Sequence, residues 1–327
     1  MAERILVTGG TGFTGCRLTQ SLLRQGHHVR VLTRSVERAP AEIREAELLE
    51  GDISDPGTVA ALVSGCDRVF HLAAAYREAG IPDRRYWEVH VRGTELLLQA
   101  AQAEGVRRFV HTSTVGVLSH IENPPADETW PHRPGDIYQA TKSEGEQLAL
   151  AFQEQHSLPV TVARPTAIYG PGDMRLLRLF RLVAKRRFVM LGSGQIYYHM
   201  VHVDDLVRGL ELLSEHPAAP GEVFILGGDG YRSLWEIVEL IAKAVDAPMP
   251  RLQVPAWPVQ LAGSLCERIC IPLGIEPPIY RRRVDFFTKS RAFTIEKART
   301  RLGYTPEISL EAGIRDTAKS YAEQGLL

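Results

Sequence analysis

A glycine-rich loop near the start of the chain constrains the fold more than any other feature of the sequence. The residues VTGGTGFTG, from Val7 to Gly15, lie between an apolar run and a helical pattern. Such a loop lets the backbone approach a pyrophosphate, and the unpaired N–H groups of the next helix favour an anion. A tight turn that needs glycine only for its backbone is the alternative; because the loop follows the first strand of an α/β pattern, we expect dinucleotide binding. The predicted contacts are Gly9, Gly12, Phe13, Thr14 and Gly15.

Short apolar runs alternate with longer helical patterns over the first half of the chain. This order is the signature of βαβ units, and it predicts an α/β fold of the Rossmann type with a doubly wound parallel sheet. The candidate strands are RILVTGG from Arg4, HVRVLTR from His28, AELLEGD from Ala46, RVFHLAA from Arg68, RRFVHTST from Arg107 and PVTVARP from Pro159.

The second half of the chain is less regular and predicts a smaller, mostly helical C-terminal lobe. Glycine and proline gather in YGPGD from Tyr169, and a return strand, EVFILGG, begins at Glu222. We expect a dinucleotide-binding domain over residues 1–170, with return segments near 196–228. The substrate-binding lobe is expected over residues 171–195 and 229–327, where it closes over the carboxyl edge of the sheet.

Composition argues against several classes of function. A net charge of −1, without a basic run carrying interleaved aromatics, predicts no nucleic-acid partner. The apolar segment from Trp257 is broken by Glu267 and Arg268, so it predicts a core or lid helix rather than a membrane anchor. No further His or Cys completes a metal site with Cys266 and Cys270. With no CxxC pair and no apolar signal segment before the first strand, we expect a protein of the reducing cytoplasm without metal.

The end of the second strand bears on the choice of cofactor. In dinucleotide folds a carboxylate there often holds the adenosine ribose, whereas a nearby arginine accommodates a 2′-phosphate. Thr33 stands at the carboxylate position and Arg34 follows it. This favours NADP(H), with NAD(H) as the alternative and an ordinary exposed arginine as the other interpretation of Arg34. After the third strand, Asp52 and Ile53 are predicted contacts on the adenine side, and a helix cap is the other role open to Asp52.

A tyrosine and a lysine four positions apart raise the question of chemistry. In DIYQATKSEGEQLAL, Tyr138 and Lys142 fall on one face of a predicted helix and present a phenol and an ammonium group side by side. The spacing alone does not separate an active site from an ordinary helix surface. Its meaning depends on the motifs that accompany it.

Ordered motifs along the chain give it a resemblance to one family. They are TGGTGFTG from Thr8, HLAA from His71, TST from Thr112, YxxxK at Tyr138, RPxxxYGPGD from Arg164, VHVDD from Val201 and RLGYTP from Arg301. With these motifs the chain resembles an extended short-chain dehydrogenase/reductase, that is, a member of the NAD-dependent epimerase/dehydratase superfamily. The order and spacing of the motifs are far more specific than any one of them.

The resemblance implies a catalytic triad of Thr114, Tyr138 and Lys142. A free phenol has a pKa of about 10, and an adjacent ammonium group favours the phenolate, so Tyr138 would exchange a proton near neutral pH. Lys142 would also bind the nicotinamide ribose, and Thr114 would hold the substrate oxygen, with Ser113 as the other hydroxyl for that role. Further implied cofactor contacts are Ala73, Ala74, Tyr138 and Pro165, and implied substrate contacts are Ser113, Tyr76, Thr166 and Tyr198.

Within the family, the chemistry divides at a few positions. The 4,6-dehydratases resemble S-T-D-E where this chain has Ser113 to Gly116 without a carboxylate, which disfavours dehydration. Epimerases resemble R-D-F-I-H-V-D-D, and here Tyr198 and His199 stand at the Arg and Asp positions, so a charge-assisted phosphate contact is missing there. Other arginines, at 178 and 281–283, leave a nucleotide sugar open.

The remaining resemblance is to the 3β-hydroxysteroid dehydrogenase and dihydroflavonol reductase side of the family. It implies an NAD(P)-dependent oxidoreductase that interconverts a secondary alcohol and a ketone on a small molecule. A nucleotide-sugar epimerase with tightly bound NAD and a non-catalytic dinucleotide-binding sensor or scaffold are the alternatives. His90 stands where relatives usually show Asn, and a hydrogen-bonding role and simple packing are both open to it. Members are often dimers through segments equivalent to 85–104 and 137–156, so we expect a homodimer.

Overall fold

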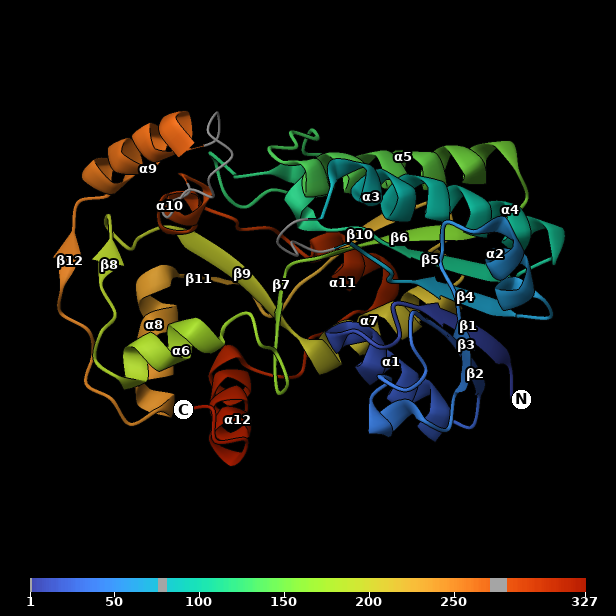
Figure 1. The fold of residues 1–327 in the computed structure, drawn as a ribbon, viewed down its shortest axis with the longest axis horizontal. Helices are drawn as coiled ribbons and strands as arrows, with labels where there is room; N and C mark the ends of the chain where they lie inside the picture. The colour runs from blue at the N-terminus through green and yellow to red at the C-terminus, as the bar shows by residue number, and fades with distance from the viewer. Residues whose placement is uncertain (1, 76–80, 271–280) are drawn as a thin grey trace.

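The computed structural model describes residues 2–75, 81–270 and 281–327. Over these residues its largest layer is a seven-stranded sheet in the order β10-β6-β5-β4-β1-β2-β3, and every neighbouring pair is parallel (Figure 1). The strands are β1 (Arg4–Thr8), β2 (His28–Thr33), β3 (Glu47–Glu50), β4 (Arg68–His71), β5 (Arg108–Thr112), β6 (Val160–Pro165) and β10 (Val223–Leu226). The order reverses between β1 and β4, which confirms the predicted doubly wound α/β fold.

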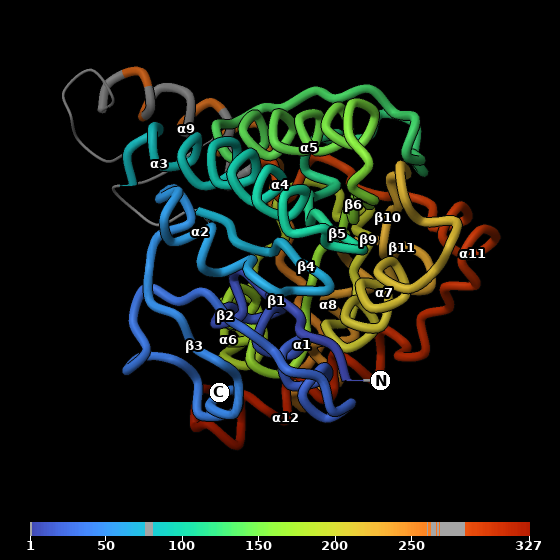
Figure 2. Tube along the Cα trace, turned by 90° about the vertical axis from the view of Figure 1, so that its right-hand side faces the viewer, coloured from blue at the N-terminus to red at the C-terminus, as the bar shows by residue number. Residues whose placement is uncertain are grey.

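Helices cover both faces of this sheet, as the end-on view in Figure 2 shows. The side chains of β1 alternate between two hydrophobic cores, with Ile5 and Val7 in one and Leu6 in the other. Burial on both faces explains why the strands are continuous apolar runs in the sequence. One face carries α1 (Phe13–Arg24) and α7 (Val203–Glu215), and the other carries α2 (Pro56–Val63), α3 (Asp83–Trp87), the π-helical turn η2 (Glu88–Arg92), α4 (Gly93–Ala103) and α5 (Ile137–Gln155).

The second half of the molecule forms a lobe with its own core, which includes Phe180, Ile237 and Tyr321. The lobe contains helices, as expected, and also two small sheets in the orders β11-β9-β7 and β12-β8. Their strands are β7 (Ala167–Tyr169), β8 (Met190–Leu191), β9 (Tyr197–His202), β11 (Tyr231–Ser233) and β12 (Gln253–Val254). The later helices are α6 (Leu177–Ala184), α8 (Leu234–Ala244), α9 (Trp257–Cys270), α10 (Arg281–Thr288), α11 (Glu296–Leu302) and α12 (Leu310–Glu323). The short helices η1 (Ala41–Ile43) and η3 (Val115–Leu118) are the remaining elements of the described residues.

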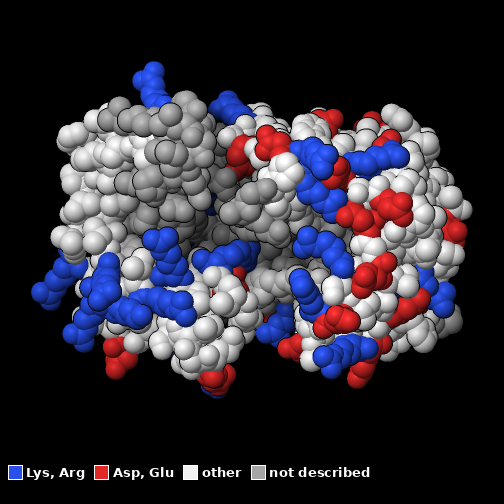
Figure 3. Space-filling model, viewed as in Figure 1, with Lys and Arg blue, Asp and Glu red and all other residues white. Residues whose placement is uncertain are grey.

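The surface carries both signs of charge. On the face in Figure 3, acidic and basic side chains mix over the half with the large sheet, basic ones gather at the lower left, and the surface is hollowed between the halves. The residues in and after α6 include Arg178, Arg181, Lys185, Arg186 and Arg187. Among the described residues, no helix is both long and apolar enough to cross a membrane.

Close backbone contacts explain why the first loop is rich in glycine. Gly9 has a φ of +72°, a region that side chains rarely adopt. A Cβ built on Gly15 would lie 2.1 Å from the carbonyl oxygen of Gly9. The start of α1 can therefore press against the loop only when residue 15 has no side chain.

We predict that Gly15→Ala forces α1 away from the loop and lowers the free energy of unfolding by about 1–3 kcal/mol, as overpacking does. Urea unfolding followed by circular dichroism measures the change. The control is Gly57→Ala, because the nearest atom to a Cβ there is 3.5 Å away. Equal stability of the two variants would contradict the assigned contact.

Candidate active site

The candidate site lies at the carboxyl edge of the large sheet, at the switch point between β1 and β4. Open parallel sheets bind their ligands at such a point. The loops after these two strands touch, since a Cβ built on Gly9 would lie 2.8 Å from the backbone nitrogen of Ala73. The same nitrogen donates to Thr8 Oγ1 at 3.3 Å. The structure thus brings the glycine loop and half-buried Ala73 together, with exposed Ala74 next along the chain.

The N-terminus of α1 is arranged as an anion site. Gly12 precedes the helix with an extended backbone, no side chain caps the helix, and its first turn has no acidic residue. The backbone N–H groups of Phe13 and Thr14 therefore have no acceptor within the helix and lie at the positive end of its dipole. A pyrophosphate bound there would accept hydrogen bonds from them. The Arg175 guanidinium carbon lies 5.5 Å from the centroid of the Phe13 ring. The lobe thus adds a cation beside this helix end, a contribution that the sequence analysis missed.

The end of β2 places an arginine at the surface and turns its threonine inward. The Thr33 hydroxyl donates to the carbonyl oxygen of Ser35 at 2.9 Å, and Arg34 is exposed. The nearest carboxylate in the strand register, that of Glu50, accepts a hydrogen bond from the backbone nitrogen of Val36 at 3.1 Å. The end of β2 therefore presents the positively charged side chain of Arg34 at the surface, as the sequence predicts.

Asp52 is held by a partner that the sequence did not reveal. Arg85 of α3 donates to both of its carboxylate oxygens, at 2.5 and 3.2 Å, and Ser54 donates to it as well. Partial burial raises the pKa of Asp52, but these hydrogen bonds outweigh it and lower the pKa to about 2. Ile53 is buried against Gly93. Asp52 therefore fastens α3 to the edge of the sheet.

Helix α5 carries the predicted tyrosine and lysine to the end of β5. Asp136 caps this helix by accepting from the backbone nitrogen of Gln139 at 2.8 Å. Lys142 is buried, and its Nζ donates to the carbonyl oxygen of Thr112 at 2.5 Å. Burial lowers the pKa of Lys142 to about 8, and the charge of Glu146 acts in the opposite direction. The half-buried Tyr138 lies one turn before Lys142 on the same helix.

The hydroxyl of Thr114 lies beside this helix. Thr114 has an extended backbone, and its Oγ1 accepts from the backbone nitrogen of Gly116 at 3.0 Å. That bond uses a lone pair and leaves the hydroxyl hydrogen for a second partner. A Cβ built on Gly116 would lie 3.6 Å from Gln139 Cγ, so η3 packs against the first turn of α5. The segments that bear Thr114, Tyr138 and Lys142 therefore meet at one place.

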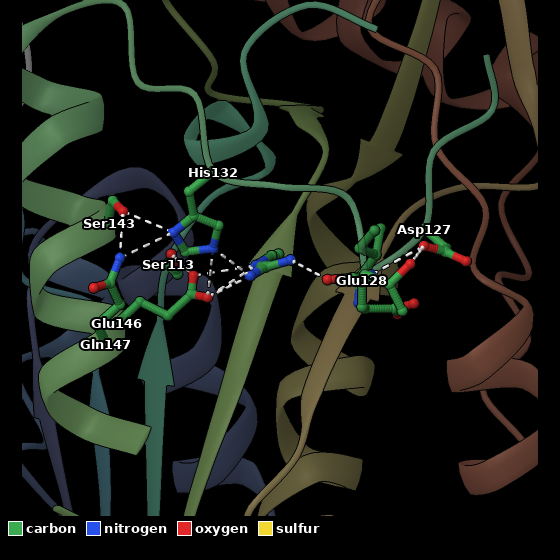
Figure 4. A network of polar contacts seen from close by, with 10 residues as sticks. Ser113, Asp127, Glu128, His132, Ser143, Glu146 and Gln147 are labelled. Atoms are coloured by element: carbon green, nitrogen blue, oxygen red, sulfur yellow. Dashed lines mark hydrogen bonds and ion pairs between the residues drawn. The ribbon is translucent and has the colours of Figure 1, made fainter. Parts of the chain in front are cut away.

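Ser113 belongs to a buried ionic network that the sequence analysis did not assign. Its Oγ donates to Glu146 Oε2 at 2.5 Å, and Arg164 of β6 donates to both oxygens of the same carboxylate. Figure 4 shows Ser143 and Glu146 projecting from α5 toward His132. Burial raises the pKa of Glu146, but the hydrogen bonds from His132, Arg164 and Ser113 outweigh it and lower the pKa to about 2. Glu146 follows Lys142 by four positions, and this spacing was the signal available in the sequence.

The remaining predicted substrate contacts are dispersed. Tyr76 lies outside the described residues. Thr166 is buried, and its backbone nitrogen donates to the carbonyl oxygen of Leu226 next to the end of β6 at Pro165. Tyr198 is also buried, and its Oη donates to the carbonyl oxygen of Phe286 at 2.6 Å inside the lobe. The structure thus places the Tyr198 hydroxyl in the lobe core and does not bring it to the triad.

The fold and the tyrosine–lysine helix define an enzyme of the extended short-chain dehydrogenase/reductase type. The model of the NAD dependent epimerase/dehydratase family matches residues 5–227. The chain therefore belongs to this family.

Two curated relatives and one solved structure are similar over nearly the whole chain. A 3 beta-hydroxysteroid dehydrogenase/Delta 5→4-isomerase of Mycobacterium tuberculosis is 32% identical, with 97% of this chain and 90% of that protein covered. A 2-alkyl-3-oxoalkanoate reductase of Stenotrophomonas maltophilia is 31% identical, with 98% and 99% covered. The crystal structure of gox2253 superposes with a TM-score of 0.84 at 28% identity and covers 99% of both chains.

We predict that Glu146→Gln removes the negative charge facing the buried Arg164 guanidinium. The free energy of unfolding at pH 7 should fall by about 3–5 kcal/mol, as when a buried ion pair is broken. Because folding lowers the pKa of Glu146 from 4.5 to about 2, its contribution is complete above pH 4.5 and is lost as the pH falls toward 2. Stability of the variant should therefore vary less over this range, as measured by urea unfolding at several pH values.

The control is Glu144→Gln, which changes an exposed glutamate of the same helix. It should keep both the stability and the pH dependence of the natural protein. If Glu146→Gln keeps the full pH dependence between 4.5 and 2, the assigned ionic contribution is wrong.

Proposed function

We propose that this enzyme interconverts a secondary alcohol and a ketone on a small-molecule substrate by hydride transfer, with NADP(H) as its cofactor. The observation that carries the proposal is the helix α5, which presents Tyr138 one turn before a buried Lys142 at the end of β5. The names of the two relatives, a hydroxysteroid dehydrogenase and an oxoalkanoate reductase, agree with chemistry at an alcohol or ketone carbon.

Each residue of the site has a separate role in the reaction. The nicotinamide supplies or accepts the hydride when it is bound. Tyr138 donates a proton to the carbonyl oxygen in the reducing direction and accepts it in the oxidising direction. The ammonium group of Lys142 favours the phenolate that remains. Thr114 donates its free hydroxyl hydrogen to the substrate oxygen and fixes it beside Tyr138.

The proposal extends to the surroundings of the site. The substrate enters between the two halves, where residues 171–195 and 229–327, together with strands β7 and β9, form the lobe that selects it. The protein acts as a homodimer through the segments 85–104 and 137–156. Cys16 and Cys66 are free thiols, which agrees with the reducing cytoplasm.

The predicted effect of Tyr138→Phe is a fall in kcat of about 10²–10⁴-fold, the usual contribution of a general acid or base. The Kd for NADPH should stay within about threefold, because the phenol acts on the substrate and not on the phosphates. Oxidation of NADPH is followed by absorbance with a panel of ketones, and Kd by fluorescence titration. The control is Tyr304→Phe, whose hydroxyl donates to the carbonyl oxygen of Gly227 within the core. Undiminished turnover in Tyr138→Phe would refute the proposed role.

Arg34→Ala tests the choice of cofactor. Loss of a charge-assisted contact to the 2′-phosphate should weaken NADPH binding by about 10–100-fold, equivalent to about 1.5–3 kcal/mol. Binding of NADH should change little. Arg38→Ala, another exposed arginine of the same loop, is the control. Equal losses for the two cofactors would show that Arg34 does not read the phosphate.

The state of the purified protein separates the alternatives. An epimerase keeps its NAD through both hydride steps, so NAD released by denaturation, with no net redox turnover, would favour that function. A sensor or scaffold would bind dinucleotide and turn over nothing. A protein isolated empty that then oxidises NADPH with a ketone would support the proposed reaction.

A further inference from the structure

His90 lies at the centre of the site's framework, although no step above uses it. It belongs to η2, the π-helical turn between α3 and α4, and its side chain is buried. Its Nε2 lies 3.0 Å from the backbone nitrogen of Ala75, in the loop after β4. Its Nδ1 lies 2.8 Å from Oγ1 of Thr141, in α5 next to Lys142. One imidazole thus joins the loop after β4 to the helix that carries the tyrosine and lysine.

The partners of the ring fix its tautomer. A backbone N–H can only donate, so His90 Nε2 accepts from Ala75 and carries no proton. The Thr141 hydroxyl donates to the carbonyl oxygen of Ile137 at 2.8 Å, so its oxygen accepts from a proton on Nδ1 of His90. His90 is therefore neutral with its proton on Nδ1. A second proton would displace the Ala75 amide from Nε2.

The ring also contacts the proposed proton donor. The centroids of the His90 and Tyr138 rings are 5.5 Å apart at an interplanar angle of 83°, an edge-to-face contact. Tyr86 of α3 packs against the same ring at 5.9 Å and 68°. The imidazole is therefore wedged between α3 and the first turn of α5, where it limits the positions open to the Tyr138 ring.

A second chain of hydrogen bonds reaches the backbone of the same residue. The Thr94 hydroxyl donates to the carbonyl oxygen of His90 at 2.7 Å and lies 2.9 Å from Nε2 of His71. His71 Nδ1 lies 2.8 Å from Oγ1 of Thr8, which also accepts from the backbone nitrogen of Ala73. Side chain and backbone of His90 thus connect α5 to both loops of the predicted cofactor site.

We propose that His90 is a positioning residue, which holds the loop at Ala75 and the Tyr138 ring in register for proton and hydride transfer. This inference rests on the proposed function only for its kinetic consequences. A nonpolar ring of similar size would fill the space but leave the Ala75 amide without its acceptor. The Thr141 hydroxyl keeps its hydrogen bond to Ile137 whether residue 90 is histidine or a nonpolar ring. The hydrogen bond with Ala75 is therefore the one whose loss should affect the site.

Three substitutions separate the two hydrogen bonds of the ring. His90→Phe keeps a ring and removes both bonds. His90→Gln places an amide oxygen near the Nε2 position and restores an acceptor for Ala75, whereas the shorter His90→Asn reaches only the Nδ1 side. We expect kcat to fall at least tenfold in the Phe and Asn variants and to recover to within threefold of the natural enzyme in the Gln variant. The Kd for NADPH should stay within threefold in all of them.

A matched control exists in the same core. His111→Phe changes another fully buried histidine, whose two ring nitrogens have no hydrogen-bond partner among the described residues. It should keep kcat within threefold. Natural kcat in His90→Phe, or equal losses in the Gln and Phe variants, would overturn the proposal.

The tautomer of His90 can be tested by spectroscopy on the natural protein, without a substrate and without any substituted variant. Imidazole ¹⁵N spectra of the natural protein report which ring nitrogen of His90 carries the proton, with the resonance assigned by selective labelling. We expect the neutral Nδ1–H form from pH 8 to pH 5. The ionisable groups that face or act on His90 are Tyr86 from α3, Tyr138 and Lys142 from α5, and His71 from β4.

Burial is the main cause that lowers the pKa of His90 to about 2, and the charge of Lys142 adds to it. An Nε2–H tautomer, or protonation of the ring above pH 5, would overturn the inference even if the enzyme proves active. Failure to find any turnover would instead count against the proposed function and leave the tautomer result standing.

Discussion

The burial of one ammonium group at the sheet edge determines how the rest of the site is built. Lys142 is almost wholly removed from water, which is costly for a charged group. Its donor bond to Thr112 and the carboxylate of Glu146 offset part of that cost. Burial, assisted by the same positive charge, lowers the pKa of His71 and His90, so both rings are neutral and serve as hydrogen-bonding groups. Burial and the nearby ammonium charge thus act in the same direction on both histidines.

Local patterns in the sequence were sufficient to predict the fold and the class of chemistry. Apolar strands alternating with helices predicted the doubly wound sheet, because strands buried on both faces must be apolar throughout. The spacing of Tyr138 and Lys142 placed the pair on one helical face, and the capped helix α5 has that face at the end of β5. These features depend on residues that are close together in the sequence, so the spacing of residue types is enough to predict them.

Contacts between residues distant in the sequence could not be predicted from such local patterns. Asp52 meets Arg85, 33 positions away, and Ser113 meets Glu146, also 33 positions away. Tyr198 was a candidate substrate contact, but its strand β9 buries it against Phe286 in the lobe. The small sheets of the lobe were also unexpected, since all their strands except β9 have two or three residues and leave almost no periodicity. Such features follow from tertiary packing and not from local preference.

The depressed pKa of Lys142 links occupancy of the site to the proton activity of the solvent. With a pKa of about 8, the buried amine exchanges its proton about one pH unit above neutral. The proposed chemistry uses the ammonium form, so a cofactor that selects this form draws protons from the buffer as it enters. By thermodynamic linkage, its apparent affinity then falls as the solution becomes more alkaline. On this proposal, the side chain that favours the phenolate also takes up a proton when the cofactor binds.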